Sequence, residues 1–198
     1  EGDIFCAGAD LRREESESNV PKLEGSDDIS LMLRHLYKPV ICKIQGSVLA
    51  GALLMVTNST HAVAVQEAKF SAPEILRGLW PHMVMAGLFR VMPKRAGLDF
   101  VMRGQSIDAK QAKEWGLINE FVRAEELDDY VNKLSEELAS LAPGTMSFGL
   151  EAYEKQDAMA FDEALPFLQK QIAKTFEGPD AKEGIAAFLE KRKPNWDK

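Results

Sequence analysis

The chain has 198 residues, which is enough for one domain with a substantial core and a helical appendage. Its composition, 45% hydrophobic and 28% charged, is that of a globular protein, and no apolar run reaches the roughly 18 to 20 residues that cross a bilayer. With 31 acidic against 24 basic side chains the formal net charge is −7, which argues against a surface built to bind nucleic acid. We therefore expect neither a membrane nor a nucleic acid as a partner.

The two cysteines, Cys6 and Cys42, stand at no spacing typical of metal ligands, and the histidines form no metal-binding pair. Two cysteines without a signal peptide suit a reducing compartment, so we expect a cytoplasmic protein without a metal site. We interpret both thiols as small core residues rather than reactive groups.

Short apolar segments alternate with helical patterns through the first part of the chain. Residues 4–6 look like the end of a buried strand that enters a small-residue turn at 7–9. Residues 12–28 are charge-dense and predict either a solvated loop or a lid over a site. Helical spacing then predicts a helix over 29–37, and alternation predicts a strand over 40–45.

Further along, residues 50–59 predict a helix that is apolar nearly all round, and 61–66 a short strand. Pro93 and the Ser106/Asp108 pair can each open a helix, and Gly104 and Gly116 stand where helix ends favour glycine. The last third is mostly helical. The pattern predicts an α/β core over residues 1–122 and a helical region over 123–198.

Five segments of the chain resemble, in the same order, segments of the enoyl-CoA hydratase/isomerase, or crotonase, superfamily. The resemblance covers nearly the whole chain. The segments are FCAGADL (5–11), KPVICKIQGSVLAGALL (38–54), AKFSAPEILRGLWP (68–81), RGQSIDAKQAKEWGLINEFV (103–122) and EGIAAFLEKRKPNW (183–196).

The resemblance implies a spiral core of ββα turns and a C-terminal helical region that forms trimers, often paired into hexamers. It implies an acyl-CoA or enoyl-CoA thioester as substrate, with coenzyme A arriving as part of that substrate and no separate cofactor. It also implies opening strands, several tens of residues long, before the FCAGADL segment. We expect these strands to be missing from this sequence, which starts without a methionine.

The resemblance further implies an oxyanion hole made by two backbone amides, those of Ala9 and Gly51, and places Ala7, Ala9, Asp10 and Leu11 at the CoA-binding segment. The chemistry agrees, because amides that converge on one thioester oxygen need turns with little side-chain bulk. The second amide lies at a helix start, where the helix dipole favours negative charge. The alternative is that both segments are only tight turns.

Two-glutamate hydratases of this family hold one carboxylate in the helix after the second amide and another in a Pro-Glu dipeptide. Glu74 matches the second position. At the first position, three residues after Gly51, stands Leu54, which cannot transfer a proton. We therefore interpret Glu74 as a single catalytic base, the alternative being a surface glutamate that starts a helix after Pro73.

Two further residues are candidates. His82 stands where the family often has glycine, and it either contacts substrate as a second acid or base or only fills space. Lys191, in the basic segment near the C-terminus, is either a contact for the CoA phosphates or part of a solvated helix end.

Three functions follow as hypotheses. The favoured one is a one-base isomerase that converts a β,γ double bond into an α,β double bond with Glu74. The second is a hydratase that recruits a substitute group, such as His82 or a residue of the opening strands. The third is a CoA-binding relative without catalytic activity, which Leu54 would permit.

Overall fold

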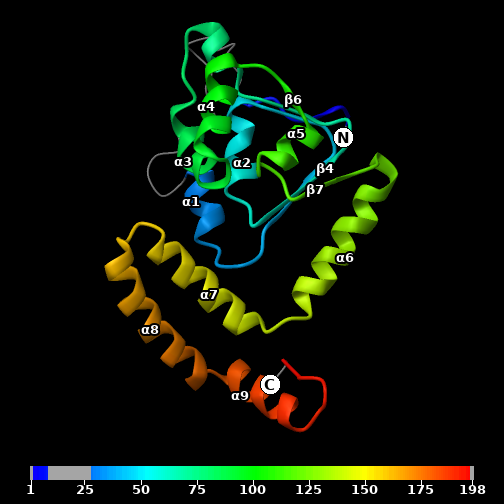
Figure 1. Cartoon of the computed structure of the whole chain (residues 1–198). Helices are drawn as coiled ribbons and strands as arrows, with labels where there is room; N and C mark the ends of the chain where they lie inside the picture. The colour runs from blue at the N-terminus through cyan, green and yellow to red at the C-terminus, as the bar shows by residue number, and fades with distance from the viewer. Residues whose placement is uncertain (1, 9–27, 197–198) are drawn as a thin grey trace, which may run out of the picture. The chain divides into compact units, whose positions relative to one another are not determined.

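The structure, a computed structural model, describes residues 2–8 and 28–196. The chain forms two compact units, drawn in Figure 1. The first runs to Lys133 without Arg34–Lys38, and the second contains Arg34–Lys38 and the chain from Leu134 onward. The boundary between residues 122 and 123 stays a prediction.

The first sheet has the order β1-β3-β5-β6. Strands β1 (Ile4–Cys6), β3 (Ser47–Leu49) and β5 (Lys69–Ser71) are parallel, and β6 (Ile107–Asp108) is antiparallel to β5. Phe70 in β5 has no exposed surface. Val48 in β3 also has no exposed surface, so the middle strands of this sheet carry its buried residues.

The second sheet has the order β2-β4-β7 and is entirely parallel. Its central strand β4 (His61–Val65) lies between β2 (Ile41–Ile44) and β7 (Glu120–Val122). Val63 and Ala64 on β4 are fully buried, which explains why this strand is apolar on both faces.

The helical segments between strands supply the rest of the first unit's core. The 3₁₀ turn η2 (Ala50–Ala52) continues into α2 (Leu53–Thr57), which packs on α3 (His82–Val91). The helices cross closely because Gly87 has no side chain: a Cβ there would collide with the Thr57 side chain. Leu53 of α2 and Leu88 of α3 have no exposed surface, so both helices contribute to the buried core.

The remaining segments of the first unit include the short helix α1 (Ile29–Arg34), the 3₁₀ turns η3 (Pro73–Arg77) and η4 (Ala124–Glu126), and the helices α4 (Lys94–Arg103) and α5 (Ala109–Glu114).

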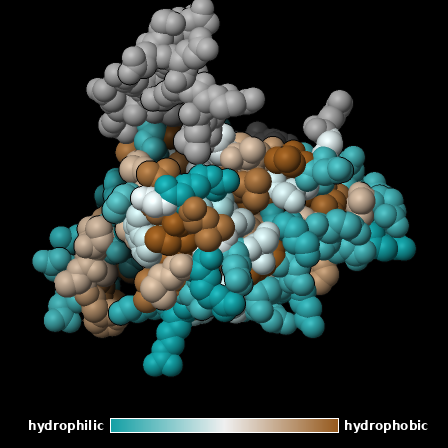
Figure 2. Space-filling model, turned by 90° about the horizontal axis from the view of Figure 1, so that it is seen from above, coloured by the Kyte–Doolittle hydropathy of each residue, from teal (hydrophilic) through white to brown (hydrophobic). Residues whose placement is uncertain are grey.

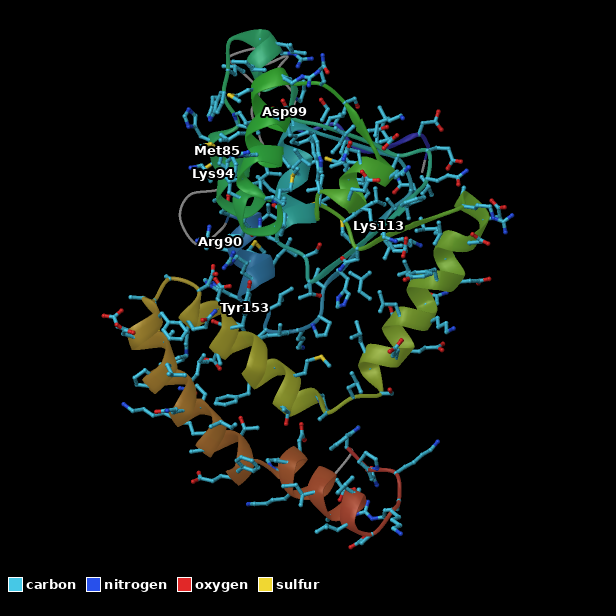
Figure 3. All side chains as sticks on the ribbon, in the orientation of Figure 1. Met85, Arg90, Lys94, Asp99, Lys113 and Tyr153 are labelled. Carbon is cyan, nitrogen blue, oxygen red and sulfur yellow. The ribbon has the colours of Figure 1, made fainter. Side chains whose placement is uncertain are left out.

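The helix ends confirm the capping residues predicted from sequence. Gly104 ends α4 with a φ of 58°, and Gly116 has a φ of 79°, both in the left-handed region that favours glycine. Asp108 caps α5 by accepting a hydrogen bond from the Gln111 backbone N–H at 2.8 Å. Lys113 of α5, labelled in Figure 3, forms an ion pair with Glu120 of β7 and so links the helix to the second sheet.

The second unit is helical. It contains the end of α6 (Leu127–Ala139), α7 (Pro143–Gln156), α8 (Phe161–Glu177) and α9 (Pro179–Leu189). At the chain end, the Trp196 indole N–H donates to the Ser140 carbonyl at 2.9 Å. Among the described residues, no helix is long and apolar enough to cross a membrane.

The strands expected at 4–6, 40–45 and 61–66 are confirmed, as is the mostly helical last third. The helix expected over 29–37 ends earlier, at Arg34. Strands β3 and β5 were not predicted, because a strand of three residues shows too little alternation to be separated from its turns.

Cys42 lies in the core of the first unit at 8% exposure, and burial raises the pKa of its thiol to about 12. The reactive thiolate is therefore nearly absent at about pH 8. We expect iodoacetamide to modify Cys42 only after unfolding, as measured by peptide mass spectrometry. Equal labelling of Cys42 in native and denatured protein would contradict this placement.

Candidate active site

Three predicted site segments follow strands that lie side by side. β1, β3 and β5 are parallel neighbours, so their carboxyl ends meet at one edge of the sheet. Ala7 and Gly8 follow β1, Gly51 follows β3 by two residues, and Glu74 follows β5 by three. In parallel sheets this edge is where ligands bind, because the connecting turns open there.

The turns after β1 and β3 are in direct contact. Gly8 has a φ of 83°, and a Cβ on it would stand 3.1 Å from the Gly51 backbone nitrogen and 3.1 Å from the Ala50 Cβ. Ala50 itself has a φ of 53°, which is costly for a residue with a side chain. Such strain is retained where surrounding structure requires it, and it is frequent in functional sites.

The Gly51 amide lies in the first turn of η2, where backbone N–H groups have no acceptor inside the helix. A Cβ on Gly51 would meet nothing within 4 Å, so the surroundings of this residue are open. The amide can therefore donate to a ligand atom placed before it. Ala9, Asp10 and Leu11 lie outside the described residues.

Glu74 is the second residue of η3, immediately after Pro73. The residue is half-buried, and its Oε2 atom is buried with no hydrogen-bond partner among the described residues. A buried acceptor without a partner costs about 1 to 3 kcal/mol, so native structures rarely keep one without a reason. A catalytic carboxylate is one such reason, since its partner would be the substrate.

The backbone around Glu74 is well ordered by hydrogen bonds. Its carbonyl accepts from the Leu79 N–H at 3.0 Å, and Gly78 closes the turn in the left-handed conformation. These hydrogen bonds involve the backbone of the turn and do not use the Glu74 carboxylate.

The position expected for a second carboxylate holds Leu54, half-buried in the first turn of α2. Its carbonyl accepts from the Asn58 side-chain amide at 2.8 Å, which is a bond within the helix. Neither Leu54 nor the fully buried Leu53 beside it can carry a proton.

His82 is the first residue of α3, and its side chain is exposed. Its backbone N–H donates to the Trp80 carbonyl at 2.8 Å. One turn further, Met85, labelled in Figure 3, accepts a weak bond from the Trp80 indole at 3.0 Å. Lys191 lies in the second unit at the end of α9, exposed and with a φ of 55°. The roles of His82 and Lys191 stay predictions.

Large apolar side chains are exposed along the segment that carries Glu74. They are Ile75, Leu76, Leu79 and Met83, between 37% and 69% exposed. Figure 2 shows that apolar surface gathers in separate patches among polar side chains on the face that it draws. Sequence reasoning missed this cluster and the part played by Gly8, although a glycine between two alanines was a visible signal.

One parallel sheet edge thus carries two small-residue turns and the half-buried Glu74, which is the arrangement that the resemblance to the crotonase superfamily implies. The family model described as enoyl-CoA hydratase/isomerase matches residues 1–198. The chain belongs to the enoyl-CoA hydratase/isomerase family, whose members are enzymes that act on acyl-CoA thioesters.

The chain is also similar to individual proteins that are named as hydratases. Mevalonyl-coenzyme A hydratase sidH of Aspergillus fumigatus is 31% identical over 98% of this chain and 74% of that protein. A probable enoyl-CoA hydratase of Bacillus subtilis is 31% identical over 99% of this chain and 78% of that protein. The crystal structure of an enoyl-CoA hydratase of Mycobacterium smegmatis has a TM-score of 0.90 at 28% identity, covering 100% of this chain and 79% of that one.

Proposed function

We propose that the protein isomerises enoyl-CoA thioesters with Glu74 as its only base, moving a β,γ double bond to the α,β position. The observation that carries this proposal is the buried Oε2 of Glu74, which has no hydrogen-bond partner among the described residues. Glu74 follows β5, the neighbour of the strand β3 that leads to the Gly51 amide. Isomerisation needs one group that accepts and then returns a proton, whereas hydration by the family's two-carboxylate route needs a second acid where Leu54 stands.

The reaction takes place in two proton transfers. The Glu74 carboxylate removes a proton from the α-carbon, and the electron pair of that C–H bond enters a dienolate that extends over the thioester oxygen and the β,γ double bond. The protonated Glu74 then delivers the same proton to the γ-carbon, which leaves the double bond between the α- and β-carbons. No water is added, and the carboxylate returns to its starting state.

The dienolate oxygen is stabilised by the backbone amides of Gly51 and Ala9. Support comes from the contact between Gly8 and the Gly51 nitrogen, which brings the residue before Ala9 against the second amide. Backbone donors aimed at a developing oxyanion are worth about 10² to 10³ in rate each. In this proposal Ala7, Ala9, Asp10, Leu11 and Lys191 contact the CoA part of the substrate.

Hydration is the second candidate, and the names of the relatives favour it, because several are called hydratases. Hydration requires a second proton-transferring group, because Leu54 cannot supply a proton. His82 is the candidate on this chain, with its exposed imidazole at the start of α3.

We also propose that the protein is located in the cytoplasm.

The experiment that tests the proposal is a panel of matched β,γ- and α,β-enoyl-CoA thioesters, with double-bond position and water addition followed by mass spectrometry and ultraviolet absorbance. Conversion of the β,γ isomer without hydration supports the one-base enzyme. Binding of the thioesters without turnover would contradict the one-base enzyme and would indicate a CoA-binding protein without catalytic activity.

We further propose that the second unit assembles copies of this chain into a trimer or hexamer. Helix α8 exposes an apolar stripe at helical spacing, and stripes of this kind on soluble proteins mark association surfaces. Its members are Phe161, Leu165, Leu168, Ile172 and Phe176, with exposures between 36% and 78%.

Placing a charge in this stripe is expected to prevent assembly. Ile172→Glu would bury a carboxylate in the contact between copies, which is unfavourable without a partner charge. Light scattering should then give the mass of a monomer, whereas Ala173→Glu, an exposed position of the same helix outside the stripe, should keep the assembly. A monomeric parent protein would refute the stripe as an association surface.

A further inference from the structure

We propose that Gly104, at the end of α4, is a positioning residue for Glu74, acting through the turn η3. The proposal rests on the function proposed above, in which Glu74 is the base. Gly104 acts through the distance at which it lets η3 approach the helix end.

The approach is closest where the two segments meet. A Cβ on Gly104 would stand 2.9 Å from Ile75 Cγ2 and 3.0 Å from Leu76 Cγ, the two side chains directly after Glu74. Ordinary contacts of a Cβ begin at 3.4 Å. Any larger residue at position 104 therefore pushes these side chains, and the turn that bears them, away by about half an ångström.

The strand before Glu74 forms a hydrogen bond with the same glycine. Ser71, the last residue of β5, is 6% exposed, and its hydroxyl donates to the Gly104 carbonyl at 3.3 Å. The chain is thus fixed to the end of α4 on both sides of Glu74, three residues before it and one to two residues after it. The φ of 58° at Gly104 turns the carbonyl and the bare Cα toward these neighbours.

A small displacement of η3 matters because proton transfer depends on the position of the carboxylate. A misplacement of about 1 Å can cost about 10²-fold in rate. We expect Gly104→Ala to lower kcat by about 10-fold or more with little change in KM, because the binding surface for CoA lies on other segments. Ser71→Ala removes the hydrogen bond to the Gly104 carbonyl without adding bulk, and we expect it to lower kcat by a smaller factor than Gly104→Ala.

The matched control is Gly116→Ala. Gly116 also has a positive φ, 79°, but it follows α5, and a Cβ there would meet the Val91 carbonyl oxygen at 2.7 Å, outside η3. Both variants carry the backbone strain of an alanine in the left-handed region, so both should lower Tm by about 2 to 8 °C. Only Gly104→Ala should lower kcat strongly.

The decisive test is rescue. Ile75→Ala and Leu76→Ala together remove the atoms that a Cβ on Gly104 would strike, so in that background Gly104→Ala should cost less than 3-fold in kcat. An equal loss in both backgrounds, or equal losses for Gly104→Ala and Gly116→Ala, would overturn the positioning role. If Glu74→Gln keeps full activity, the proposed function itself fails, and the two failures are thereby distinguished.

Discussion

Glu74→Gln is expected to lower the rate of double-bond isomerisation by about 10³-fold, within the roughly 10² to 10⁴ that a positioned acid or base contributes. The amide has nearly the shape of the carboxylate but cannot carry a proton between two carbons. Because Oε2 has no partner among the described residues, the substitution breaks none of their hydrogen bonds at that atom. We therefore expect the free energy of unfolding to change by less than about 1 kcal/mol.

Glu74→Asp is the companion variant. It keeps a carboxylate but withdraws it by one methylene, so it should lose part of the rate and keep the reaction. Rates measured at saturating β,γ-enoyl-CoA separate the chemical step from binding, and KM should change little in both variants. Full activity of the Gln variant on every thioester that turns over would eliminate Glu74 as the base.

The second large effect is expected for Leu54→Glu, which should create or raise hydration of α,β-enoyl-CoA by about 10²-fold, the lower contribution of one acid or base. Leu54 lies in the first turn of α2, three residues after Gly51, at the position where the resemblance implies an acid in two-carboxylate hydratases. The position is half-buried, so a carboxylate there keeps some contact with water. Isomerisation should survive, because Glu74 is unchanged.

Leu54→Gln is the matched control, with the same shape and no transferable proton, and it should not hydrate. Uptake of oxygen from solvent into the product, followed by mass spectrometry, gives the measurement. If wild-type protein hydrates as fast as Leu54→Glu, the missing acid at position 54 is not what limits hydration.

Much of the candidate site could be proposed from the sequence, because its signals are local. The small residues around Gly51 and the Pro73-Glu74 pair could be recognised in single segments, as could the left-handed end of α4 at Gly104. The absence of a carboxylate at Leu54 was equally visible. Each of these features depends on residue type and near neighbours alone.

What could not be predicted depends on strand register. The contact of Gly8 with the Gly51 nitrogen follows from the parallel pairing of β1 with β3, which no local pattern reveals. The same holds for the approach of Gly104 to Ile75, which lies 29 positions earlier in the printed sequence. The apolar residues around Glu74 predict a partly desolvated carboxylate, but only the packed structure shows that Oε2 is the buried atom.

The most direct test of the one-base mechanism is turnover of a β,γ-enoyl-CoA in ¹⁸O-labelled water, with double-bond position and product mass recorded together. The mechanism predicts migration of the double bond to the α,β position until the two isomers reach equilibrium, and no label in the product. Labelled 3-hydroxyacyl-CoA, formed at the rate of migration or faster, would contradict it and assign the protein to hydration.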